Sequence, residues 1–134
     1  MAVHDQLHAA ASRVLSRAYA PYSNHPVAAA ALDAAGTVHV GVNIENASFG
    51  LTQCAEGSLI GAWRLAAGEP LTHLVCLNEA GDYITPCGRC RQVLYEHAPP
   101  TLSIATATGP MTLAQLLPAA FGPQNLQDEP CTPL

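Results

Sequence analysis

Two short cysteine-containing segments constrain this chain more than any other feature. The first is Cys54-Ala55-Glu56, and the second is Pro86-Cys87-Gly88-Arg89-Cys90. Three thiolates can hold a metal ion in tetrahedral geometry and leave one position open for water. A carboxylate beside that open position can move protons to and from the water. The sequence therefore predicts a Zn²⁺ site, one ion per chain, with ligands Cys54, Cys87 and Cys90 and with Glu56 as the catalytic proton carrier.

The spacing of the three cysteines has a physical reason. Cys87 and Cys90 are one helical turn apart, so both sulfurs can face one point if a helix opens at Gly88. Cys54 would stand at the start of a second helix, with Glu56 in its first turn. Two helix N-termini would then meet at the metal, and their positive dipole ends favour thiolates over thiols.

A structural metal site is the main alternative. A lone Cys-x-x-Cys pair is also found in redox sites and in halves of structural zinc sites. A four-ligand structural zinc would need Cys76, Cys131 or a histidine as its fourth ligand. That alternative gives Glu56 no role.

A second motif, Asn43-Ile44-Glu45-Asn46-Ala47-Ser48, joins the cysteine segments. With it, the chain resembles the small zinc-dependent cytidine deaminases of the homotetrameric class. The resemblance runs through nearly the whole chain in the family's order. It is carried by Ala18 to Ser23, Asn43 to Ser48, Cys54 to Glu56, Pro86 to Gln92, Leu116 to Pro118 and Phe121.

The resemblance implies hydrolytic deamination of cytidine and deoxycytidine to uridine and deoxyuridine, with release of ammonia. It implies that Asn43 and Glu45 bind the ribose, although Asn43 could instead form an Asx-type turn at a strand end. It also implies that the Ala55 N–H and the Thr85 carbonyl contact the base. Phe121 is expected to reach a neighbouring subunit's site, or else to pack in an ordinary interface.

Composition and charge narrow the range of partners. The chain has 134 residues, of which 49% are hydrophobic and 11% charged, with a net charge of −5. Its five cations are all arginines, and they form no stripe that could follow a phosphate backbone. The length predicts a single domain over residues 1–134, with residues 122–134 as a possible loose tail. We expect a small nucleoside substrate, no nucleic acid partner and, from the low charge and the resemblance, a homotetramer.

The number and placement of the cysteines, together with the hydropathy of the chain, predict the cellular compartment of the protein. Five cysteines, three of them placed as metal ligands, argue against a disulfide framework. No apolar signal segment and no membrane-spanning run is visible in the sequence. The expectation is a protein of the reducing cytoplasm with no membrane partner.

The pattern of apolar residues and turn signals predicts an α/β chain. Val27 to Asp33 is alanine-rich and ambiguous, and the resemblance assigns it to a strand. The expected class is a three-layer α/β/α sandwich with one mixed central sheet of about five strands. Helices are predicted over His4–Tyr19, Cys54–Ala67, Gly88–His97 and Leu113–Leu117, and strands over Val27–Asp33, Thr37–Val42, Leu71–Asn78 and Leu102–Ala107.

Two residues depart from the family pattern. Gly57 stands where the family usually has an arginine that donates to the ligand sulfurs, so empty space near the metal is expected. Arg91, Arg64 or the helix dipoles would then offset the thiolate charge. His25 stands where a phenylalanine usually packs against the nucleoside. These changes leave open a deaminase of N4-substituted cytidines or of a blasticidin S-type nucleoside, and a zinc-stabilised protein without turnover is the remaining alternative.

Overall fold

The computed structural model describes residues 2–126. A five-stranded sheet with the order β2-β1-β3-β4-β5 forms its centre. β1 pairs antiparallel with β2 and β3, β3 pairs parallel with β4, and β4 pairs antiparallel with β5, so the sheet is mixed. The strands are β1 Ala28–Asp33, β2 Val38–Val42, β3 Leu71–Leu77, β4 Ser103–Ile104 and β5 Met111–Thr112.

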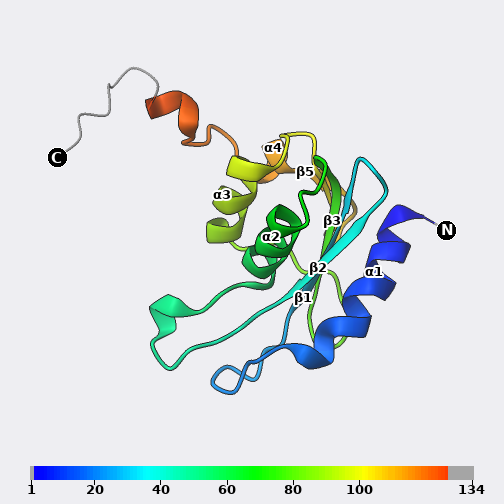
Figure 1. Ribbon diagram of the computed structural model, residues 1–134, viewed down its shortest axis with the longest axis vertical. Helices are drawn as coiled ribbons and strands as arrows, with labels where there is room; N and C mark the ends of the chain where they lie inside the picture. The colour runs from blue at the N-terminus through cyan, green and yellow to red at the C-terminus, as the bar shows by residue number, and fades with distance from the viewer. Residues whose placement is uncertain (1, 127–134) are drawn as a thin grey trace.

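Helices cover both faces of this sheet (Figure 1). The alanines of β1 alternate between two apolar clusters: Ala28 and Ala30 join α1, while Ala29 and Ala31 join α2 and α3. The predicted three-layer α/β/α arrangement is therefore confirmed. The helices are α1 Val3–Val14, α2 Ala55–Leu65, α3 Gly88–His97 and α4 Leu113–Leu116, with 3₁₀ turns at Leu15–Arg17, Phe49–Leu51 and Pro123–Leu126.

Small residues allow α2 to lie very close to the sheet. The four alanines Ala28–Ala31 are fully buried. At Gly41 in β2, a Cβ atom would collide with the backbone of Ala55 and Leu59 in α2. The first turn of α2, which carries the first metal-ligand candidate at its start, is thus placed by backbone-to-backbone contact with β2.

The predicted elements agree with the structure except at three places. The strand expected over Leu102–Ala107 pairs only at Ser103–Ile104, as β4. The helix expected over His4–Tyr19 ends at Val14 and continues only as a 3₁₀ turn to Arg17. The reason is a tertiary contact, because Tyr19 pairs in extended conformation with Ile44. Strand β5 was not predicted, since two residues are too short to give an alternating pattern.

The C-terminal segment is described only as far as Leu126. Residues 123–126 of the expected tail form a 3₁₀ turn, Gly122 precedes it, and residues 127–134, including Cys131, lie outside the described residues. Within residues 2–126, no helix has both the length and the apolar character needed to cross a membrane.

Candidate active site

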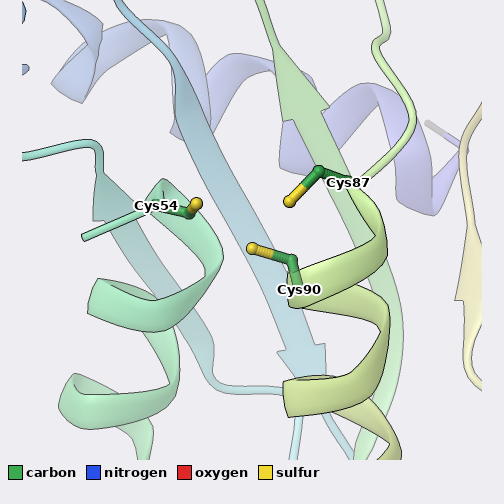
Figure 2. Close-up of side chains that lie close together, drawn as sticks. All are labelled: Cys54, Cys87 and Cys90. Atoms are coloured by element: carbon green, nitrogen blue, oxygen red, sulfur yellow. The ribbon is translucent and has the colours of Figure 1, made fainter. Parts of the chain in front are cut away.

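The structure brings the three predicted ligand cysteines together. Cys54 is the N-cap of α2, Cys87 is the N-cap of α3, and Cys90 lies in the first turn of α3. Their sulfur atoms all lie within 4.8 Å of one another. Figure 2 shows the three sulfurs turned towards one point between the two helix starts. One metal ion at that point could contact all three.

Local backbone geometry explains why the helix N-termini face the sulfurs. Cys54 and Cys87 have extended backbones, with ψ angles of 158° and 167°, and neither side chain caps its helix by a hydrogen bond. The first-turn N–H groups of α2 and α3 therefore lack side-chain acceptors from these caps. Together with the helix dipoles, they give positive potential where the thiolates would sit.

The protonation chemistry of the cluster fits a bound cation. Burial raises the pKa of the Cys54 thiol, and the nearby Cys87 and Glu56 charges add to this effect. Burial also raises the pKa of Cys90 far above its usual range, with the Glu56 charge as the next cause. Such thiols lose their protons only when a cation replaces them. Three close sulfurs of this kind suit a thiophilic metal such as Zn²⁺.

Glu56 lies in the first turn of α2 beside this cluster and is only 5% exposed. Its Oε2 accepts a hydrogen bond from the Cys90 thiol at 3.3 Å, and its Oε1 accepts one from the Cys76 thiol at 3.3 Å. Cys76, considered above as a fourth ligand of a structural zinc site, lies on β3 and is not in the group of three cysteines. Cys76 is fully buried and contacts Glu56, and this contact depends on the shared apolar cluster of β3 and α2 rather than on spacing in the sequence.

A cavity of about 460 Å³ opens beside Glu56, within the size range of small-molecule sites. Five residues predicted to bind substrate line it, and so do Cys54, Glu56 and Cys87. The five are His25, Asn43, Glu45, Ala55 and Thr85. Sequence reasoning did not point to the other five lining residues, which are Ser23, Val27, Thr52, Gln53 and Ile84.

Asn43 follows β2, and its side chain makes two hydrogen bonds to the backbone of the segment that forms one wall of the cavity. Its Oδ1 accepts a hydrogen bond from the Val27 N–H at 2.9 Å, and its Nδ2 donates to the His25 carbonyl at 2.9 Å. These bonds cross to a neighbouring segment, so an Asx-type turn does not describe Asn43. One amide hydrogen remains for another partner.

Glu45 holds the adjacent loop. Its Oε1 accepts from the backbone N–H groups of Tyr22 and Ser23, and the Ser23 hydroxyl donates to its Oε2. The Ser23 hydroxyl is the main reason why the pKa of Glu45 is lowered. Glu45 is thus an anion that both orders the loop and faces the cavity.

Phe121 does not line the cavity of its own chain. Its side chain is 62% exposed, and its carbonyl accepts a hydrogen bond from Gln92 Nε2 at 2.9 Å. An exposed phenylalanine held in place by its backbone is available to a second chain.

The arginines considered as replacements for the missing family arginine have other partners. Arg91 donates from Nε to the Pro86 carbonyl and from Nη1 to the Leu116 carbonyl. The Arg64 guanidinium lies 5.6 Å from the ring centroid of Trp63, in the last turn of α2. Within residues 2–126, neither Arg91 nor Arg64 donates a hydrogen bond to a ligand sulfur, whereas the N-termini of α2 and α3 face the sulfurs.

The space at Gly57 is smaller than the sequence suggested. A Cβ atom at Gly57 would lie 3.2 Å from Gln53 Oε1, so the Gln53 side chain occupies part of the expected empty space. Gly57 also does not line the main cavity. The substitution therefore changes the surroundings of the helix start more than the volume available to a substrate.

Comparison with known proteins agrees with this geometry. Residues 1–106 match the family described as the cytidine and deoxycytidylate deaminase zinc-binding region. The cytidine deaminase of Mycobacterium tuberculosis is 44% identical over 119 residues, which cover 89% of this chain and 90% of that protein.

Solved structures give the same result. The cytidine deaminase from Mycobacterium leprae superposes with a TM-score of 0.85 at 47% identity, covering 88% of this chain and 99% of that chain. The crystal structure of the M. tuberculosis enzyme gives a TM-score of 0.87 at 43% identity, covering 91% and 99%.

These matches confirm the predicted α/β fold and the predicted deaminase enzyme. They also account for a cluster of three thiols beside a buried carboxylate, since the matching family region is a zinc-binding one. The chain belongs to the cytidine and deoxycytidylate deaminase family.

Proposed function

We propose that this protein hydrolyses cytidine and deoxycytidine to uridine and deoxyuridine with release of ammonia. The observation that carries the proposal is the place of Glu56. Its carboxylate lies at the wall of a 460 Å³ cavity and within hydrogen-bond distance of a thiol of the three-cysteine cluster. A proton carrier at that position can serve both a metal-activated water and a nucleoside in the cavity.

Zn²⁺ held by Cys54, Cys87 and Cys90 would supply a water whose pKa is lowered towards about 7. Glu56 would take one proton from this water and give it to ring N3, which would make C4 electrophilic towards the hydroxyl group. After addition at C4, Glu56 would move the remaining hydroxyl proton to the amino group, so that the C4–N bond could break and ammonia leave.

The chain's own groups would orient the nucleoside for this reaction. The Ala55 N–H and the Thr85 carbonyl would bind the base edge, and His25 would pack against the nucleoside at the cavity wall. The free amide hydrogen of Asn43 and the Glu45 carboxylate would bind the ribose hydroxyls.

A homotetramer would complete the site with Phe121 from a neighbouring chain. Exposed large apolar side chains support association where they form a contiguous patch, as the rings of Tyr22 and Phe49 do with centroids 6.1 Å apart, because such patches mark protein interfaces. The exposed side chains include Tyr19, Tyr22, Ile44, Phe49 and Leu51 near the cavity loops, and Leu65, Phe121 and Leu126 elsewhere. We further propose one domain over residues 1–134 and a cytoplasmic location.

A second candidate substrate class is favoured by the position of His25. This residue lines the main cavity and also a neighbouring hollow of about 340 Å³ formed with Asn78, Glu79 and Ala80. A substituent on the nucleoside could pass His25 and enter this hollow. An N4-substituted cytidine or a blasticidin S-type nucleoside is therefore the alternative substrate.

The test is a spectrophotometric assay of protein whose zinc content has been measured. Cytidine, deoxycytidine, an N4-substituted cytidine and blasticidin S are compared, with Glu56→Ala as the matched control. Loss of cytidine absorbance with formation of uridine and ammonia, abolished in Glu56→Ala and by a chelator, is expected. Turnover of the modified compounds without turnover of cytidine would move the assignment to the second class. No turnover of any compound by zinc-loaded protein would overturn both.

A further inference from the structure

A buried thiol behind Glu56 is not used by the mechanism above. Cys76 lies on β3, is fully buried, and belongs to the apolar cluster that α2 and α3 form with the sheet. Its sulfur donates a hydrogen bond to Glu56 Oε1 at 3.3 Å. Its carbonyl accepts a hydrogen bond from the Ile84 N–H, which fixes this end of the strand. The thiol is therefore held at a defined place on the inner side of the carboxylate.

The two oxygens of Glu56 have different neighbours. Oε2 accepts from Cys90, which must lose its proton to act as a ligand, whereas Oε1 accepts from Cys76, which is not a ligand candidate. Burial is the main reason why the pKa of Cys76 is well above its usual range, followed by the charge of Glu56. Cys76 also lies outside the group of three cysteines that could share a metal ion, so a cation bound there would not replace its proton.

We propose that Cys76 is a positioning residue for the reaction. Its S–H group holds Oε1 so that Oε2 is directed to the reacting atoms. This inference rests on the proposed role of Glu56 as proton carrier. A thiol is a weak donor, so it can orient the carboxylate without competing strongly for the proton that Glu56 must carry.

Simple packing is the competing explanation, and variants at Cys76 can separate the two. Cys76→Ser keeps a donor, Cys76→Val fills the space without a donor, and Cys76→Ala removes both. Val75→Ala is the matched control, because Val75 is fully buried on the same strand but belongs to the cluster on the α1 side of the sheet. It makes a comparable cavity away from Glu56.

We expect kcat to fall about three- to tenfold in both Cys76→Val and Cys76→Ala, with KM and zinc content unchanged. Cys76→Ser should recover most of the loss, and Val75→Ala should lower Tm without lowering kcat. Equal kcat in all variants would overturn the proposal. So would a kcat that follows Tm across the set, Val75→Ala included.

A spectroscopic measurement tests the hydrogen bond without turnover. In zinc-loaded protein the ligand cysteines carry no S–H group, so the difference between wild-type and Cys76→Ser infrared spectra isolates the S–H stretch of Cys76. Removing the acceptor in Glu56→Ala should move this band to higher wavenumber. An unmoved band would overturn the positioning role even if cytidine is turned over. A moved band in a protein inactive towards cytidine would place the failure in the proposed substrate instead.

Discussion

Two buried carboxylates near opposite ends of α2, Asp33 and Glu56, differ in how firmly hydrogen bonds hold them. Asp33 closes β1 and contacts the segment that follows α2, while Glu56 lies in the first turn of α2. Their exposures are nearly equal, at 3% for Asp33 and 5% for Glu56. Burial alone therefore does not distinguish them.

The number and strength of the hydrogen-bond donors to each carboxylate do distinguish Asp33 from Glu56. Asp33 accepts from the N–H groups of Ala35, Thr37 and Glu69, and from His39 Nε2 at 2.9 Å. The His39 hydrogen bond is the main reason why the pKa of Asp33 is lowered. Four donors leave this carboxylate little capacity for any other partner, which suits a fixed structural role.

Glu56 is held only weakly by comparison. Its recorded donors are two thiols, each at 3.3 Å, and it faces the main cavity. A buried carboxylate with unused lone pairs beside a cavity can exchange protons with a ligand. Unused hydrogen-bonding capacity, rather than burial, thus distinguishes Glu56, the proposed proton carrier, from Asp33.

The largest expected effect on turnover comes from a substitution at Glu56. Glu56→Gln keeps the size of the side chain but cannot carry a proton. We expect kcat to fall about a thousandfold, while zinc content and Tm stay near those of the wild type. Steady-state kinetics, metal analysis and a thermal melt check this together. Retained turnover would remove Glu56 from the mechanism.

Glu45 shares features with both Asp33 and Glu56, so a substitution there should have a smaller effect on turnover than one at Glu56. It accepts three hydrogen bonds from the Tyr22–Ser23 loop, as a structural acid would, but it also lines the cavity. Glu45→Gln should raise KM for cytidine about tenfold and change kcat much less, because the lost interaction serves binding. A large fall in kcat with unchanged KM would contradict this assignment.

Asp33 should have the smallest effect on turnover and a clear effect on stability. In Asp33→Asn an amide N–H replaces an acceptor, so kcat should stay unchanged while Tm falls at neutral pH. Because the pKa of Asp33 is lowered in the folded state, its contribution is present above the usual value of 3.8 and is lost as pH falls through the folded value.

The pH dependence supplies the control for that prediction. The gap in Tm between wild type and Asp33→Asn should be widest near neutral pH and should narrow below about pH 4. Melts at several pH values check this. A gap that stays constant down to the lowest pH would mean that the ionised form of Asp33 is not the stabilising one.

Local patterns in the sequence predicted the main helices and the grouping of Cys54, Cys87 and Cys90, whereas the strand over Val27–Asp33 was assigned only through the family resemblance. The helix over Gly88–His97 depends on neighbouring residues and was predicted with its correct bounds, and the helix over Leu113–Leu117 was predicted one residue too long. The Cys76–Glu56 contact, the cross-segment bonds of Asn43 and the early end of α1 depend on tertiary pairing. Spacing along the chain carries no signal for such contacts.

Gly41 shows how a residue without a side chain controls the geometry of the reaction. Any Cβ at this position would have to push α2 away from β2. Because the start of α2 carries Cys54 and Glu56, such a shift would separate them from Cys87 and Cys90, which belong to α3. A displacement of about 1 Å can reduce catalysis about a hundredfold. The position of Cys54 and Glu56 relative to Cys87 and Cys90 therefore depends on Gly41, a residue of the sheet that does not line the cavity.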